Sequence, residues 1–126
     1  MFANYNYDNF PIVKVDLSGT ILSNDDFTNF TQQWLELYNK KEYFEFIFDT
    51  KNCGLVNPKY CLYTALFIKS IKKQKIQYLK NSKIYVYNKY IYKLLQIIFY
   101  IEKPVAPVEI LLYNNDEYIS TKKISN

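Results

Sequence analysis

The sequence contains neither histidine nor arginine, and all 16 of its basic residues are lysines. Histidine is the side chain that most often transfers protons near neutral pH, and arginine is the one that grips phosphate or carboxylate with two parallel hydrogen bonds. Their absence excludes catalytic triads, histidine-based metal sites and arginine clamps. We therefore expect a protein that is not an enzyme.

Glycine and cysteine are scarce as well, with two of each. Gly19 and Gly54 begin neither a G-x-G-x-x-G nor a G-x-x-x-x-G-K-[ST] pattern, so no nucleotide cofactor is expected. Cys53 and Cys61 are too few for a disulfide framework and form no C-x-x-C pair. Cys53 has no histidine to activate its thiol, so we expect no covalent catalysis.

Long hydrophobic runs and an N-terminal leader pattern are missing too. No apolar run approaches the roughly 20 residues of a membrane span, and residues 1–10 are not basic and then apolar as in a signal peptide. The expectation is a cytoplasmic protein. The excess of Lys, Asn, Ile, Tyr and Phe resembles proteins encoded by AT-rich genomes, among them large DNA viruses, and for a viral protein the compartment would be the host cytoplasm.

What the chain does have is apolar content, at 49% of 126 residues, with 19% aromatic. This is enough for one packed core and far from the composition of disordered chains. The formal net charge of +4 is modest. We expect a single domain with its core at about residues 11–113.

Hydrophobic periodicity predicts alternating strands and helices. Strands are expected at residues 12–17, 43–49, 83–87 and 108–112, and a further short one at 117–119, before a polar tail at 122–126. The uninterrupted run at residues 46–48 indicates a central strand covered on both faces. Helices are expected at residues 24–40, opened by Ser23, at 58–75, opened by Asn57 and Pro58, and from Asn88 to just before Pro104. The order predicts an α/β fold with a central, mostly parallel sheet of four or five strands and three or four helices.

One part of this order resembles the STAS domain, the fold of anti-sigma factor antagonists. The strand at residues 44–49 ends in Asp49, a loop of about eight residues follows, a helix opens at Asn57 and Pro58, and another strand and helix come after. The resemblance implies a STAS-like fold in which a Ser or Thr at the start of the second helix is phosphorylated by a partner kinase. Here Asn57, Pro58, Lys59 and Tyr60 stand at that point, so the phosphorylation switch is expected to be lost unless Thr50 or Tyr60 replaces it.

Two aspartates at strand ends, Asp16 and Asp49, are a candidate for a divalent cation site. Acids at such positions more commonly accept hydrogen bonds from loop amides, and we expect that role and no metal. The leading hypothesis from sequence is a non-enzymatic protein-interaction module, binding an unidentified protein or a second copy. Its candidate partner-binding residues lie around the loop at 50–57: Thr50, Lys51, Asn52, Cys53, Asn57, Lys59 and Tyr60.

Two alternatives stay open. A lysine cluster could contact nucleic-acid phosphates, with nearby tyrosines stacking on bases; its members are Lys69, Lys72, Lys73, Lys75 and Lys80. The third helix, with an apolar run at residues 97–101, could instead lie on a lipid surface, although burial in the core is the simpler interpretation. An exposed corner at Asn57 and Pro58 would favour the interaction module, whereas a deep apolar cavity would favour binding of a lipid or small molecule.

Overall fold

The computed structural model describes residues 2–126, and it has nine regular elements. In chain order these are β1 (Ala3–Asn6), β2 (Ile12–Gly19), α1 (Asn24–Tyr38), β3 (Phe44–Cys53), α2 (Lys59–Ile71), β4 (Leu79–Val86), α3 (Lys89–Ile101), β5 (Val108–Asn114) and β6 (Glu117–Ile124). The chain is therefore α/β, with the alternation that the sequence predicted.

All six strands form one sheet, and their order across it is their order along the chain. The strands β2, β3, β4 and β5 are parallel to their neighbours, while β1 and β6 run antiparallel at the two edges. We predicted a mostly parallel sheet of four or five strands. The structure shows a mixed sheet of six. Each edge strand pairs with the strand next to it in the chain: β1 with β2, and β6 with β5.

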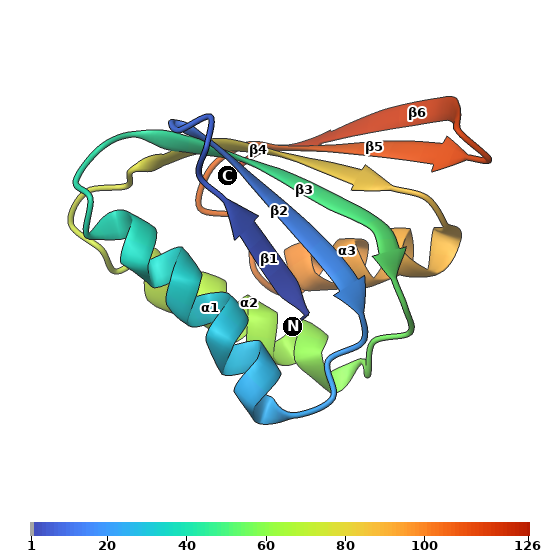
Figure 1. Cartoon of the computed structure of the whole chain (residues 1–126), viewed down its shortest axis with the longest axis horizontal. Helices are drawn as coiled ribbons and strands as arrows, with labels where there is room; N and C mark the ends of the chain where they lie inside the picture. The colour runs from blue at the N-terminus through green and yellow to red at the C-terminus, as the bar shows by residue number, and fades with distance from the viewer. Residues whose placement is uncertain (1) are drawn as a thin grey trace.

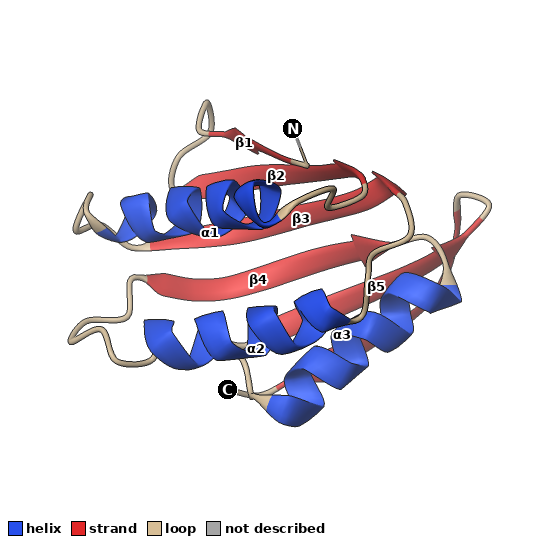
Figure 2. Cartoon of the chain, turned by 90° about the horizontal axis from the view of Figure 1, so that it is seen from below, coloured by secondary structure: helices blue, strands red, loops and turns tan. Residues whose placement is uncertain are grey.

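The three helices cover one face of the sheet and leave the other face open (Figure 1, Figure 2). Each helix connects parallel neighbours, and each connection steps in the same direction across the sheet. Because such crossovers are almost always right-handed, all three helices are placed on the same side. The prediction that β3 is covered on both faces is wrong: Phe46 and Phe48 are buried beneath the helices, but Ile47 between them is only partly covered.

Aromatic rings fill the layer between sheet and helices. Trp34 of α1 meets Phe46 of β3 and Phe67 of α2 edge to face, with ring centroids 5.0 and 5.1 Å apart. Phe44 and Phe46 are at most 1% exposed. Edge-to-face pairs each add about 0.5–1.5 kcal/mol beyond the area they bury, so this cluster fixes α1 and α2 on the sheet.

Helix starts follow the predicted capping residues. The Ser23 side chain accepts from the Asp26 amide, and Asn88 accepts from the Ile91 amide at 2.9 Å. At α2 the Asn57 side chain accepts from the Lys59 amide at 3.0 Å, but Pro58 stands at the cap position and the helix begins at Lys59, one residue later than predicted. The helices α1 and α2 end at Tyr38 and Ile71, earlier than predicted. None of the helices within residues 2–126 has the length and apolar composition needed to span a bilayer.

The C-terminal hairpin was only partly predicted. Asn115 and Asp116 both adopt positive φ, at 49° and 67°, which is the geometry of a two-residue hairpin turn. The strand β6 continues to Ile124, so the predicted short strand and polar tail are one long edge strand. Its side chains are exposed on both faces except at Ile124. A strand with neither face buried has no alternating hydrophobic pattern, and the sequence signal is absent for that reason.

Candidate functional site

The strongest candidate for a functional surface lies where β2 and β3 end. We call it the leucine corner and define it as residues 19–23 together with residues 54–59. The amide of Gly54 donates to the carbonyl of Gly19, and Gly19 adopts φ of +67°. A Cβ added to Gly54 would lie 3.2 Å from the Gly19 oxygen. The chain's only two glycines therefore permit the two loops to touch.

Side-chain hydrogen bonds tie the same loops to the helices. The Thr20 hydroxyl donates to the Leu55 carbonyl, and the Tyr90 hydroxyl of α3 donates to the Val56 carbonyl at 2.6 Å. The Leu22 amide donates to the Asp26 carboxylate of α1 at 2.9 Å, and the Asn57 side chain accepts from the amide of Lys59, the first residue of α2, at 3.0 Å. With bonds to all three helices, the leucine corner is a held structure and not a pair of independent loops.

Two large aliphatic side chains of the leucine corner are exposed to solvent. Leu22 is 83% exposed and Leu55 is 75% exposed. Burying a leucine that was in water gains about 1.5–3 kcal/mol, so two of them on a preorganised surface are effective anchors for a partner. Asn57 and Lys59 beside them are also exposed and supply a polar rim.

The structure divides the predicted partner-binding residues into two groups. Lys51, Asn52, Asn57 and Lys59 are exposed, and Cys53 is partly exposed. The prediction that Thr50 and Tyr60 bind a partner is wrong. Their side chains are only 3% and 4% exposed, so they cannot contact one. The physical reason for Thr50 is that β3 continues to Cys53, so its side chain points under the helices and its hydroxyl donates to the Tyr85 carbonyl at 2.8 Å.

The sequence interpretation missed Leu22 and Leu55. A signal for them existed, because each is an apolar residue in a loop where neither helix nor strand periodicity requires one. Apolar side chains outside regular elements either cap the core or remain exposed, and sequence alone does not separate these cases.

Groups that could perform covalent or metal chemistry are placed unfavourably for it. Burial raises the pKa of the Cys53 thiol to about 11 and also raises the pKa of Cys61, so both thiols stay protonated at neutral pH. Asp16 and Asp49 are register neighbours on β2 and β3, but Asp49 accepts from the Lys51 amide at 2.9 Å. Within residues 2–126 no group of three or more Cys, Asp and Glu side chains is positioned to hold a metal ion.

The lysine cluster lies at the opposite end of α2 from the leucine corner. Lys69 is in the last turn of α2, and Lys73 and Lys75 follow that helix and are exposed. Lys72 pairs with Glu102 at 3.4 Å, and the Lys80 ammonium lies 3.9 Å from the centroid of the Tyr43 ring. Two of the five lysines therefore already have partners within the chain.

The third helix is divided between core and surface. Ile98 is 8% exposed and belongs to the core, whereas Ile97 and Ile101 are 47% exposed and Tyr100 is 92% exposed. The apolar run at residues 97–101 is thus explained in part by burial and in part by an apolar outer face.

The open face of the sheet carries a tyrosine cluster that the sequence analysis did not identify as such. Tyr85, Tyr87 and Tyr118 each lie within 6.0 Å of the Tyr113 ring, between centroids. Partial burial and, secondarily, the nearby Asp49 carboxylate raise the pKa of Tyr87. The Tyr85 and Tyr87 rings lie at 34° and 29° to the Tyr113 ring, and Tyr118 meets Tyr113 edge to face, so the four rings extend the sheet's cross-strand packing toward the β5–β6 turn.

Comparison of the chain with protein family models, with curated protein sequences and with solved structures finds no match.

Proposed function

We propose that this chain is a non-enzymatic protein-interaction module with a STAS-like fold, and that it binds its partner through the leucine corner. The observation that carries the proposal is the pair of exposed leucines, Leu22 and Leu55, on loops held by hydrogen bonds to three helices. A rigid surface loses little entropy on binding, so even a small apolar area on it contributes to affinity.

Three features support the STAS-like part of the proposal. Parallel strands alternate with helices through β2 to β5, Asp49 lies in β3, and Asn57 and Pro58 form an exposed corner at the start of α2. Two features depart from that pattern: β3 continues past Asp49 to Cys53, so the loop before α2 is shorter than the expected eight residues, and the chain adds the edge strand β6.

The loss of a phosphorylation switch is part of the same proposal. The Thr50 hydroxyl is buried and donates to a backbone carbonyl, and the Tyr60 hydroxyl donates to Asn24. Neither of the two hydroxyls that could replace the missing Ser or Thr is presented to a kinase. Partner choice then depends on the shape of the leucine corner and not on its phosphorylation.

The nucleic-acid alternative is less well supported by the geometry. Lys72 and Lys80 are engaged by Glu102 and by Tyr43, and for the other three lysines of the cluster no such contact is found within residues 2–126. Few phosphate contacts give weak, strongly salt-dependent binding. Affinity for a generic oligonucleotide that persists at moderate ionic strength would favour this alternative over the interaction module.

The test is site-specific photo-crosslinking in cells that make the protein. A crosslinking amino acid is placed at Lys59, beside the leucines, and at Lys73 at the far end of α2 as the matched control. We expect one discrete protein adduct at position 59, lost in the double variant Leu22→Ser, Leu55→Ser, and none at position 73. Equal adducts at both positions, or a position 59 adduct that survives the double substitution, would refute the proposal.

A further inference from the structure

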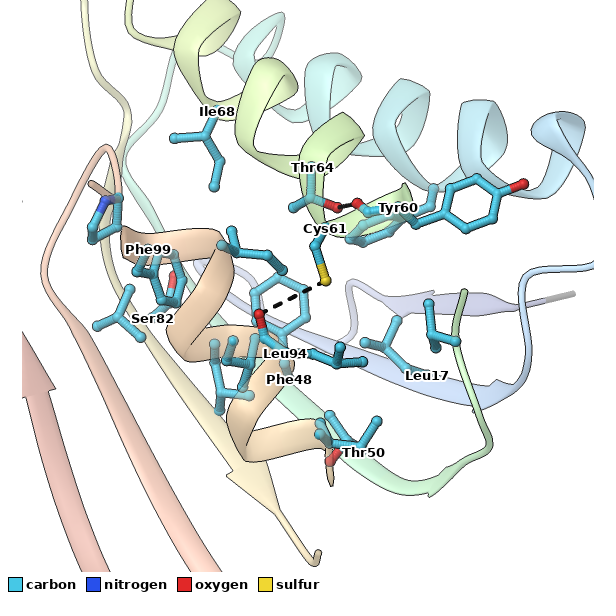
Figure 3. Close-up of a pocket in the computed structure, with 18 of the residues that line it drawn as sticks. Leu17, Phe48, Thr50, Tyr60, Cys61, Thr64, Ile68, Ser82, Leu94 and Phe99 are labelled. Carbon is cyan, nitrogen blue, oxygen red and sulfur yellow. Dashed lines mark hydrogen bonds between the residues drawn. The ribbon is translucent and has the colours of Figure 1, made fainter. Parts of the chain in front are cut away.

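A cavity of about 140 Å³ lies between the sheet and the helix layer (Figure 3). Its sheet side comes from β2, β3 and β4, with Phe48 and Ile84 among the lining residues. Its helix side comes mainly from α2 and α3, including Ile68, Leu94 and Leu95. The lining is almost entirely apolar, although the core around it is densely packed with aromatic rings.

The polar side chains at the cavity wall are mostly occupied. Thr50 and Thr64 donate to backbone carbonyls at 2.8 and 2.6 Å, and the Cys61 thiol points at the Leu94 carbonyl at 3.9 Å. A buried water needs two to four polar partners to be stable. The wall does not offer them, so water is a poor occupant for this space.

One hydroxyl at the wall is different. Ser82 in the middle of β4 is 5% exposed and lines the cavity, and within residues 2–126 the structure shows no hydrogen bond made by its side chain. Figure 3 places it at the Phe99 end of the cavity. Within residues 2–126 the one side-chain nitrogen or oxygen that is completely buried without a hydrogen-bond partner is Trp34 Nε1, and Trp34 also lines the cavity. A ligand that forms a hydrogen bond with the Ser82 hydroxyl would pair a group that no protein atom pairs.

We propose that the cavity between the sheet and helices α2 and α3 is a binding site for a small, mostly apolar molecule that carries one hydrogen-bonding group directed at Ser82. The size fits a single ring or a short hydrocarbon chain, since a dry apolar protein cavity of roughly 150 Å³ accommodates benzene. The proposal does not rest on a protein partner at the leucine corner.

Benzene and phenol are a matched pair of probes, because they share a ring and differ by one hydroxyl. Trp34 is the only tryptophan and lines the cavity, so its emission, excited where phenol does not absorb, reports on occupancy. We expect both probes to change Trp34 emission saturably and to raise the melting temperature. We expect phenol to bind about two- to tenfold more tightly, the ratio that one modest hydrogen bond confers.

Two kinds of variant locate the binding. Ser82→Ala should reduce phenol affinity to that of benzene and leave benzene unchanged. Two further variants fill the cavity with a larger side chain: Ala106→Leu from a loop and Cys61→Leu from α2. Each should lower the affinity for both probes at least tenfold. Two filling variants are used so that the failure of one to fold does not remove the test; amide spectra identify the folded ones.

Leu62→Ala is the matched control, because Leu62 is 48% exposed on α2 and does not line the cavity. It should leave both affinities unchanged. Absence of any saturable response to either probe would overturn the proposal. Binding that survives the folded filling variants but is lost in Leu62→Ala would also overturn it, because the probes would then sit on the outer surface. A phenol preference that persists in Ser82→Ala would overturn the role of Ser82.

Discussion

Replacing Ala106 with leucine should stabilise the protein, which is unusual for a substitution that enlarges a buried residue. Ala106 is 4% exposed and lines the cavity of about 140 Å³. Leucine adds three carbon atoms, worth about 2.4 kcal/mol at about 0.8 kcal/mol per buried carbon. Ordering the longer side chain costs about 0.5–1 kcal/mol. The expected net gain is about 1.5 kcal/mol, or a melting temperature about 5 °C higher for a domain of this size.

The matched control for this prediction is Ala65→Leu. Ala65 of α2 is 1% exposed but does not line the cavity, so the same enlargement should overpack the core and cost about 1–3 kcal/mol. Urea unfolding followed by circular dichroism measures both variants. The sign of the change in the free energy of unfolding is decisive. If Ala106→Leu is destabilised as Ala65→Leu is, the cavity has no room for a leucine at position 106.

Three further predictions concern pH, capping and backbone strain. Stability should fall as the pH rises from about 9 to about 12, because burial raises the pKa of Cys53 to about 11 and of Tyr38 to about 12. Both groups are neutral in both states at lower pH, and above their ordinary pKa values the unfolded chain loses protons first. Urea unfolding across this range should show a smaller decline in Cys53→Ala, and a flat profile would contradict the reasoning. Asn88→Ala should cost about 1 kcal/mol through the lost cap on α3, and Asn88→Ser should restore most of it in the same assay. Gly19→Ala should cost about 1–2 kcal/mol because its φ of +67° is strained for a residue with a Cβ, whereas a substitution of an exposed residue without such a feature stays within about 0.5 kcal/mol.

The sequence predicted those elements whose signals are local. Ser23 and Asn88 cap helices as expected, and the alternation that placed Ile84 and Val86 on one side of β4 is confirmed by their burial. A capping side chain and a two-residue period act over a few residues, so no tertiary information is needed to read them.

The remainder depends on long-range arrangement. The open face of the sheet arises from three crossovers that step in one direction, and the run at residues 46–48 gives the same apolar signal whether one face is covered or two. The extra residues of β3 at 50–53 pair mainly through their backbone, and β6 buries neither face. Propensity and periodicity report burial, so strands that are held by backbone pairing alone escape them.

The leucine corner and the cavity are two sides of one structural feature. Ile21 and Val56 belong to the corner's loops, and both line the cavity, while Leu22 and Leu55 next to them in the chain face outward. Neighbouring residues in an extended loop point in opposite directions, so one pair of loops presents an outer surface and also closes an inner space. The hydrogen bond between Gly19 and Gly54 and the contact of Tyr90 with Val56 hold both at once. Ile21 and Val56 therefore lie between the cavity and the surface on which we place the partner.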